Sequence, residues 1–185
     1  MKLSKEEKKD FLKKVVVFVD TREKKNSHII EKFKEMGIMH ESKKLDYGDY
    51  SFSVENKDFS CSCVIERKSG VNEVYGNISA DRERIEKELD TISRNANQCT
   101  FLIENVKDWE WLKTFELSDF ALKGNQRKVK NIGETCYSTL QSWQCGNRYN
   151  FKVEFVQNDK NTAVKMLELF YWYWHNYKKS TASRR

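Results

Sequence analysis

Charged side chains follow or precede apolar runs at three places in this chain, where strand ends are expected. They are Asp20 and Glu23 after the first run, Asp49 before the second, and Glu66, Arg67 and Lys68 after the third. Residues two apart in a strand point to the same side, so Glu66 and Lys68 share a face and Arg67 lies opposite. In a meander of neighbouring strands, we expect Asp49 beside Glu66, with Asp20 and Glu23 able to join them.

Two or three carboxylates beside one lysine suit the hydrolysis of a phosphodiester. Carboxylate oxygens are ligands for Mg²⁺, a bound metal activates a water and polarises the phosphate, and a lysine offsets charge in the transition state. Without a metal, acids this close would repel one another. A Glu-x-Lys triplet alone is also common at solvated strand ends. The coincidence of three charged strand ends therefore favours a site.

The apolar patterns around these residues predict an α/β fold. The continuous β-branched run at 15–19 is typical of a strand buried on both faces. Segments 38–45 and 50–54, separated by the turn signal Asp46-Tyr47-Gly48-Asp49, are expected to form a hairpin. Further strands are predicted at 60–66, 100–104 and 151–155, and helices at 28–36, 79–94, 109–115, 132–145 and 163–177.

Length and composition favour one globular domain over 15–177. A charged lead-in at 1–14 and a basic tail at 178–185, expected to be disordered, flank it. No apolar stretch is long enough to span a bilayer, and the charged N-terminus is unlike a secretory signal, which predicts a cytoplasmic or nucleoid-associated protein. The five cysteines lack metal-ligand spacing and are expected to be free thiols. The net charge of +6 permits an anionic partner without requiring one.

The order of the charged motifs resembles the XPF-type structure-specific endonucleases, the family related to the xeroderma pigmentosum group F nuclease. Its motif is Gly-Asp, a variable gap, Glu-Arg-Lys, three residues and Asp. Here Gly48-Asp49 and Glu66-Arg67-Lys68 match it, and Asn72 stands where the family has Asp. The family's V-D-x-R-E strand end matches residues 19–23, and its I-E strand end matches 103–104. The resemblance covers residues 15–104, and 132–177 more weakly.

The resemblance implies a restriction-endonuclease-like fold, with a mixed central sheet flanked by helices, and metal-dependent cleavage of branched, flap or fork DNA in repair or recombination. It implies a bound Mg²⁺ or Mn²⁺, with Asp20, Asp49 and Glu66 as its ligands or as close supports of its ligands. Lys68 would serve catalysis, and Glu23 and Arg67 would belong to the same motif set. Asn72 brings no charge, and the adjacent Glu73 is an alternative source of one if the turn rotates. Larger relatives use a tandem helix-hairpin-helix module to grip DNA and to dimerise, and from the residues after the motif we expect none in this sequence.

Candidate DNA contacts lie outside the motif. Arg82 matches a basic residue at the start of the family's next helix, although it could instead pair with Glu86. Lys123, Arg127, Lys128 and Lys130 form a basic loop that could hold phosphates, and a solvated loop is an equal alternative. The four aromatic residues at 171–174 favour core or subunit packing over base stacking.

Three functions therefore follow from the sequence. The first is a metal-dependent DNA endonuclease, with a homodimer as one assembly that the sequence allows. The second is a catalytically impaired DNA-binding module or partner subunit of the same fold, for which Asn72 is the only support. The third is an interaction protein that uses the aromatic final helix.

Overall fold

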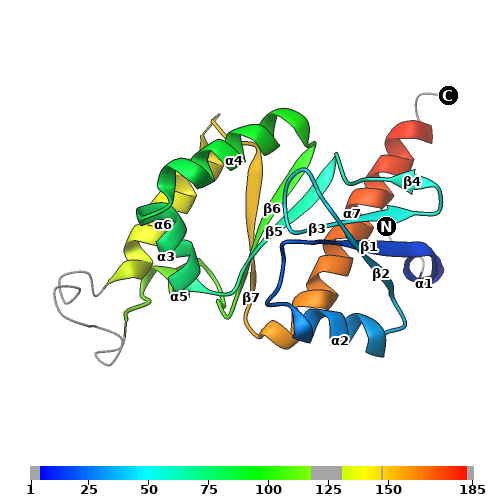
Figure 1. Ribbon diagram of the computed structural model, residues 1–185, viewed down its shortest axis with the longest axis horizontal. Helices are drawn as coiled ribbons and strands as arrows, with labels where there is room; N and C mark the ends of the chain where they lie inside the picture. Colours follow the sequence, from blue (N-terminus) through cyan, green and yellow to red (C-terminus); the bar gives the residue numbers. More distant parts are fainter. Residues whose placement is uncertain (1–4, 118–130, 147, 183–185) are drawn as a thin grey trace. The chain divides into compact units, whose positions relative to one another are not determined.

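The computed structural model describes residues 5–117, 131–146 and 148–182 (Figure 1). The chain falls into two compact units. The first runs from the N-terminus to Ile65 and takes up the chain again at Lys160, and the second comprises Glu66–Asp159. The chain passes from one unit to the other within a single strand, β5 (Cys63–Lys68). The sequence prediction of one domain over 15–177 stays a prediction.

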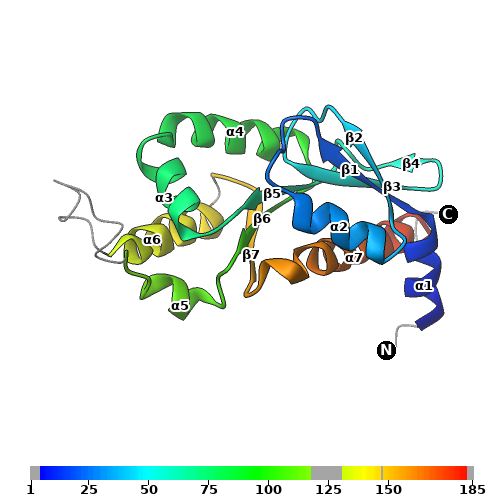
Figure 2. The ribbon, with the colours of Figure 1, turned by 60° about the horizontal axis from the view of Figure 1, so that its bottom comes forward.

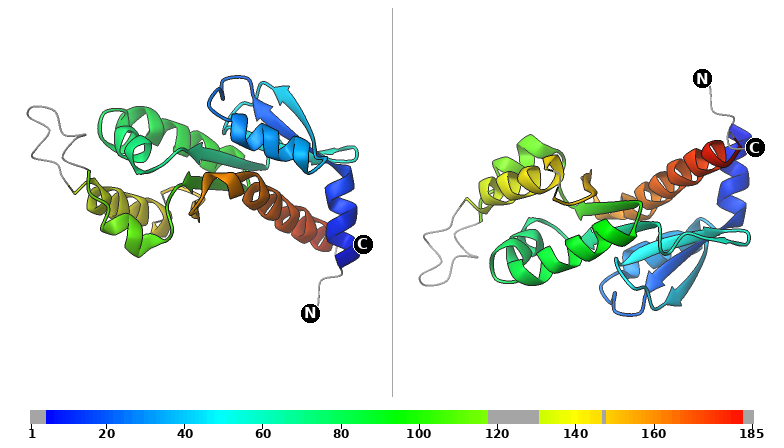
Figure 3. Two further views of the ribbon diagram at one scale, coloured as in Figure 1. Left: turned by 90° about the horizontal axis from the view of Figure 1, so that it is seen from below. Right: turned by 90° about the horizontal axis from the view of Figure 1, so that it is seen from above.

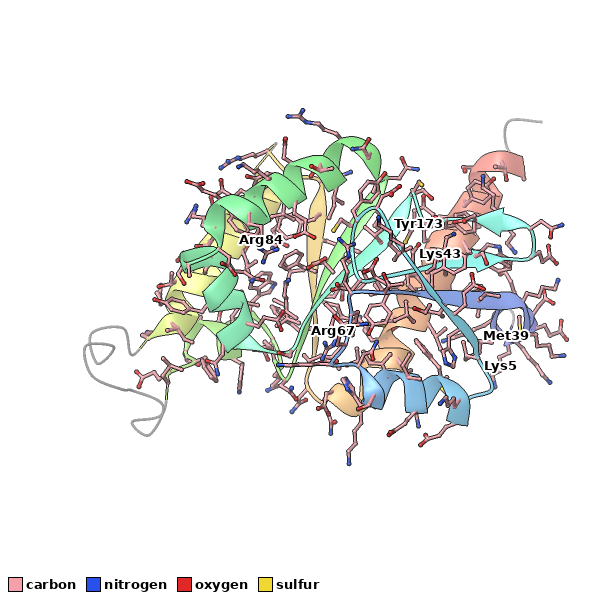
Figure 4. The ribbon with its side chains drawn as sticks, in the orientation of Figure 1. Lys5, Met39, Lys43, Arg67, Arg84 and Tyr173 are labelled. Atoms are coloured by element: carbon pink, nitrogen blue, oxygen red, sulfur yellow. The ribbon has the colours of Figure 1, made fainter. Side chains whose placement is uncertain are left out.

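The first unit is built around β1 (Val15–Asp20), whose apolar run is buried along almost its whole length. β1 pairs in parallel with β2 (Met39–Lys43) on one side and antiparallel with β3 (Tyr50–Val54) on the other. Met39 and Lys43, labelled in Figure 4, mark the two ends of β2. A strand that is apolar on both faces needs neighbours and covering helices on both sides, and β1 has a strand on each side.

The predicted hairpin between 38–45 and 50–54 is wrong. β2 pairs with β1 and not with β3, so residues 44–49 cross the end of β1 and do not form a tight reversal. The crossing is held by Asp20, whose carboxylate accepts a hydrogen bond from the Leu45 amide at 2.7 Å. A local turn signal could not reveal this long-range contact. β3 does turn back through a short ladder with β4 (Lys57–Asp58).

Helices α2 (Ser27–Glu35) and α7 (Thr162–Ala182) lie side by side against the strands of the first unit (Figure 2). Phe52 of β3 stacks on Phe59 and on Phe170, with ring centroids 4.7 and 4.6 Å apart. Tyr173, labelled in Figure 4, packs edge-on against the first two of these rings. Packing was the favoured interpretation for the aromatic residues at 171–174, and of the four only Trp172 is exposed, at 41 %.

Helix α1 (Lys5–Lys14) packs on α7. Phe11 is fully buried and contacts the rings of Tyr171 and Trp174. The carboxylate of Glu7 bonds to Lys178, and each of its oxygens lies 3.2 Å from the His175 ring nitrogen. These contacts carry α7 beyond residue 177, where the sequence predicted a disordered tail, as far as Ala182. Residues 183–185 lie outside the described residues.

The second unit holds the rest of β5 and two parallel strands, β6 (Gln98–Glu104) and β7 (Phe151–Val156). Its helices are α3 (Val71–Ser79), α4 (Arg82–Asn95), α5 (Trp109–Lys113) and α6 (Ile132–Cys145). Both views of Figure 3 place α5 beside α6, which also packs on α3. A Cβ at position 133 would lie 2.1 Å from the Leu112 carbonyl oxygen, so glycine is required where α6 begins against α5.

Helix α3 is not predicted by the sequence pattern. One helix is predicted at 79–94, whereas the structure has α3 and α4 in this region, separated near Ala80 and Asp81. Val71, Val74 and Ile78 are buried along one side of α3 at helical spacing. The run is short and contains Gly76, which weakens helix propensity, so packing against α6 decides its conformation.

Seven strands of the described chain form a mixed sheet in the order β2-β1-β3-β5-β6-β7, with β4 on β3. Parallel and antiparallel pairings both occur, and helices accompany the strands in each unit. The predicted restriction-endonuclease-like class, a mixed sheet flanked by helices, is confirmed. Among the described residues, none of the helices combines the length and the apolar character needed to cross a bilayer.

We expect the tie between α1 and α7 to weaken in acid. Hydrogen bonding by Lys178 outweighs burial, and with the help of His175 it lowers the pKa of Glu7 below its ordinary value. A lowered pKa stabilises the fold above the unfolded value, and the contribution is lost as pH falls through the folded pKa. At neutral pH, Glu7→Gln should lower the free energy of unfolding by about 1 kcal/mol.

Urea unfolding of wild type and Glu7→Gln across a pH series checks this. The gap between the two curves should close in acid. The matched control is Glu6→Gln, at an exposed position of the same helix, which should differ little from wild type at any pH. A gap for Glu7→Gln that is the same at every pH would contradict the assignment.

Candidate active site

Three strand ends of the first unit are tied together by backbone hydrogen bonds. The Asp20 amide donates to the Asp49 carbonyl oxygen at 2.8 Å, and the Asp49 amide donates to the Ile65 carbonyl oxygen at 2.8 Å. The ladder continues this alignment, because Tyr50 pairs with Val19 on one side and with Ile65 on the other. Asp20 and Asp49 therefore lie next to each other along the backbone, and their part in a metal site stays a prediction.

Gly48 explains the Gly-Asp pair before β3. Its φ is +72°, a left-handed conformation that glycine adopts without strain. A Cβ there would lie 3.0 Å from the Val64 Cβ and 3.2 Å from the Ile65 carbonyl oxygen. A larger residue would therefore push β3 and β5 apart at the point where Asp49 begins its ladder.

The carboxylate of Asp20 is buried and fully engaged. One oxygen accepts from the Arg22 amide at 2.8 Å and from its Nε at 2.7 Å. The other accepts from Arg22 Nη2 at 3.2 Å and from the Leu45 amide at 2.7 Å. Burial alone would raise the pKa of Asp20, but these hydrogen bonds and the Arg22 charge outweigh it and hold the pKa below its ordinary value. Asp20 is thus an ionised carboxylate that holds the loop carrying Leu45.

Glu66 and Lys68 form a buried ion pair on one face of β5. Lys68 Nζ donates to Glu66 Oε1 at 2.7 Å, and the two side chains are 7 % and 6 % exposed. The shared face expected from their spacing is present. The ammonium also lies 5.3 Å from the centre of the Phe101 ring. A buried pair of this kind holds both groups in a defined geometry.

The second oxygen of Glu66 is suited to a metal. Oε2 is buried, and no hydrogen bond reaches it within the described residues. A buried charged oxygen without a partner is costly and calls for an ion or water. Among the described residues, no group of three or more His, Cys, Asp or Glu side chains is placed to hold a metal. Mg²⁺ needs fewer, because it often binds through one or two carboxylates, waters and substrate phosphates.

Arg67 points to the other face of β5, as its position in the triplet predicts. Its Nη2 donates to Glu104 Oε2 at 2.7 Å, and both side chains are almost completely buried. Figure 4 labels Arg67. Glu104 ends β6, so this ion pair joins the ends of two strands within the second unit. The sequence motif at Ile103-Glu104 predicts a strand end but no partner for Glu104.

Asn72 and Glu73 occupy the first turn of α3, and both are exposed. Glu73 turns back toward β5: its Oε2 accepts from the Ser69 amide at 2.9 Å and from the Ser69 hydroxyl at 2.8 Å. Its Oε1 lies 3.9 Å from Lys68 Nζ. That Glu73 supplies the charge that Asn72 lacks stays a prediction.

The structure describes some of the remaining predicted residues and not others. Glu23 is half-buried, and its amide donates to the Asp20 carbonyl oxygen at 3.1 Å. Arg82 begins α4, pairs with Glu86 at 2.9 Å and lies over the Trp143 ring at 5.7 Å. Arg84, labelled in Figure 4, pairs with Asp81 and Glu88. Lys123, Arg127, Lys128 and Lys130 lie outside the described residues.

Comparison with known proteins agrees with these motifs. The ERCC4 domain family matches residues 19–169, most of the chain. The chain belongs to the ERCC4 domain family. The matched span includes Asp20, Asp49, the triplet at 66–68 and Asn72. A search of curated proteins found no match.

Solved structures support the fold of this ERCC4 domain. XPF from Aeropyrum pernix is similar with a TM-score of 0.54 and 18 % identity, over 83 % of this chain and 64 % of that protein. The same protein in complex with DNA matches with a TM-score of 0.54 and 18 % identity, over 87 % of this chain and 66 % of that one. The ERCC4 domain thus spans somewhat under two thirds of the length of these structures. The suspected relationship to XPF-type nucleases is confirmed.

We expect the Arg67–Glu104 pair to be essential for stability. Glu104→Gln removes the charge that Arg67 meets at 2.7 Å and should lower the free energy of unfolding by about 3 kcal/mol, because a buried charge that loses its partner is costly. Replacing both residues, as Arg67→Met with Glu104→Leu, should recover much of that loss. Urea unfolding measures both, with Glu110→Gln at an exposed position as control. Equal stability of Glu104→Gln and wild type would contradict this role.

Proposed function

We propose that this ERCC4 domain is a metal-dependent DNA endonuclease that hydrolyses phosphodiester bonds in branched, flap or fork DNA during repair or recombination. The observation that carries the proposal is the buried Glu66–Lys68 pair, in which one glutamate oxygen binds the lysine and the other has no hydrogen-bond partner within the described residues. A buried carboxylate oxygen of this kind can accept a bond from a metal ion or a water.

The motif order supports Asp49 as the companion of Glu66. Gly48-Asp49 and Glu66-Arg67-Lys68 match the motif of the XPF-type nucleases, and carboxylate oxygens are ligands that Mg²⁺ prefers. From the sequence motif we assign Asp49 and Glu66 as metal ligands. Asp20, whose oxygens are already engaged by Arg22 and Leu45, is assigned the supporting role.

Mg²⁺ or Mn²⁺, when bound, would supply Lewis acidity toward a phosphate oxygen and lower the pKa of an attacking water. The chain's own residues do the positioning. Lys68 holds Glu66 in place through their 2.7 Å contact and keeps a positive charge beside the site, where it can offset charge developing on the phosphate. Ser69 in turn orients Glu73 toward Lys68.

Support for DNA as the substrate comes from the family and from charge. XPF from Aeropyrum pernix has been solved in complex with DNA, and this chain carries a net charge of +6. Arg82 on α4 is half-exposed and is the described residue that we assign to the phosphate backbone. Lys123, Arg127, Lys128 and Lys130 are assigned to the same role from the sequence alone. A homodimer stays a prediction from the sequence.

The rival function is a DNA-binding module that does not cut, and Asn72 is the observation that favours it. Asn72 lacks the charge of the family's Asp, so the metal would be held less tightly if nothing replaced it. The two functions differ in what Lys68→Ala does. The enzyme loses cleavage, whereas the binding module never cleaves and binds DNA as before.

Cleavage of flap, fork and single-stranded substrates with Mg²⁺ or Mn²⁺ tests the proposal. Wild type should cut, and Lys68→Ala and Glu66→Gln should each cut about 100- to 1,000-fold more slowly, because they remove the charge and the ligand that act on the phosphate. Lys5→Ala and Glu6→Gln, at exposed positions of α1, serve as matched controls and should cut normally. Thermal unfolding of each variant separates loss of catalysis from loss of fold. A wild type that leaves every substrate intact would rule out the enzyme.

The dependence of cleavage on Mg²⁺ concentration tests Glu73. Glu73→Gln keeps an acceptor for Ser69 and removes only the charge 3.9 Å from Lys68. It should raise the Mg²⁺ concentration for half-maximal cleavage by about 10-fold, the effect typical of an outer-shell carboxylate. Adding Asn72→Asp to that variant should restore most of the loss. A Glu73→Gln variant with an unchanged Mg²⁺ requirement would show that Glu73 does not replace the family's Asp.

A further inference from the structure

A pocket of about 230 Å³ opens beside the end of β5, within the second unit. One wall is the turn and first helical residues after the catalytic triplet, and the other follows β6 and includes α5. Its lining residues are Ser69, Gly70, Val71, Asn72, Glu73, Asn105, Trp111 and Phe115. Of these residues, Ser69 directly follows Lys68 in the chain. The pocket is smaller than the roughly 300–1,000 Å³ of sites for drug-sized ligands, which suits a single ring system.

An exposed aromatic surface forms the far wall. Trp111 is 38 % exposed and lies against Phe115, with ring centroids 5.3 Å apart. The opposite side of the same short helix is used for packing: Leu112 is fully buried, and Trp109 contacts Phe155 at 4.8 Å. The Trp111 indole is thus turned away from the core of the unit, on a helix that has other residues to anchor it.

The wall is held rigidly. Asp108 caps α5 by accepting a hydrogen bond from the Trp111 amide at 2.8 Å. The Phe115 carbonyl oxygen accepts from the Gly133 amide at 3.0 Å, which fixes the far end against α6. A fixed aromatic face suits stacking, because little conformational freedom is lost when a flat ring settles on it.

The two walls are also tied to each other. Asn105 has a left-handed φ of +58°, and its side-chain amide donates to the Ser69 carbonyl oxygen at 3.2 Å. Gly70, at φ +155° and ψ −173°, adopts a conformation that is essentially confined to glycine. These two residues set the width of the opening between the β5–α3 turn and the segment after β6.

The polar groups of the pocket select its occupant. Glu73 places a carboxylate on the lining, which disfavours a phosphate or another anion. Asn72 is exposed in the first turn of α3 and lines the pocket. An amide offers one acceptor and two donors, the pattern that pairs with the edge of a nucleobase. A neutral, flat ring with donors and acceptors at its rim meets all of these conditions.

We infer that this pocket binds one unpaired nucleobase of the DNA strand, stacked on Trp111 and bonded at its edge by Asn72. The inference deepens the proposed nuclease function and rests on it. It also gives Asn72 a role that an Asp could not fill equally well, because an ionised carboxylate donates no hydrogen bond. A base held here would choose which phosphate lies at Glu66 and Lys68, so the pocket would set the position of the cut.

Binding of fork DNA with one abasic residue, moved along the unpaired arm, tests the pocket. Anisotropy of labelled DNA in EDTA reports affinity without cleavage. For wild type, affinity should fall about 5- to 100-fold when the abasic residue reaches one position, the effect of losing one stacked base. Trp111→Ala should bind intact DNA with that lower affinity and show no positional effect. Trp111→Phe, which keeps a ring, should retain a smaller positional effect.

Trp172→Ala is the matched control, because Trp172 is similarly exposed on α7, at 41 %. It should reproduce the wild-type profile. The base-binding inference would be wrong if wild-type affinity were the same for every position of the abasic residue. It would also be wrong if Trp111→Ala kept the dependence on position. Thermal unfolding verifies that Trp111→Ala is folded, and the Trp111→Phe result provides the same test if it is not.

Cleavage of the same DNAs with Mg²⁺ separates this inference from the proposed function. If the protein cuts but its affinity does not depend on the position of the abasic residue, the base-binding inference is wrong and the nuclease proposal stands. If affinity depends on that position but no DNA is cut, the nuclease proposal is wrong and the base-binding inference stands. A wild type that neither binds nor cuts DNA would overturn both.

Discussion

Three consecutive charged residues in a buried strand impose the constraint on which the site depends. Glu66, Arg67 and Lys68 are all buried, so none can rely on water to solvate its charge. Alternation sends Glu66 and Lys68 to one face, where they neutralise each other, and Arg67 to the other, where Glu104 meets it. Both pairs require β5 and its surroundings to be in register. A slip of one residue would leave buried charges facing apolar side chains.

The same need for compensation orders the strand ends of the first unit. Asp20 is buried as deeply as the triplet, and it is satisfied by its near neighbour Arg22 and by the distant Leu45 amide. The bond to Leu45 draws the chain across the end of β1 toward Asp49. Gly48 then brings that backbone within reach of Ile65. The carboxylate of Asp20 thus anchors the loop that leads to Asp49.

Replacement of the family's Asp by Asn72 has a different meaning once α3 is seen. The first turn of that helix places Glu73 back toward Lys68 and leaves Asn72 on the lining of the pocket with Trp111. The two adjacent residues therefore differ in what they present: Glu73 has a charge near Lys68, and Asn72 has an uncharged amide on the pocket lining.

The sequence by itself determined the buried first strand, the alternation within the triplet, the order of the motifs and hence the family and the fold class. Each of these depends on local periodicity or on residue order. Only the tertiary structure decided that β2 joins β1, that α3 exists, that Glu104 neutralises Arg67 and that Trp111 and Asn72 line one pocket. Those contacts join residues far apart in the chain or depend on packing that overrides weak local preference. The charged residues are evident in the sequence, but which of them pair depends on the tertiary structure.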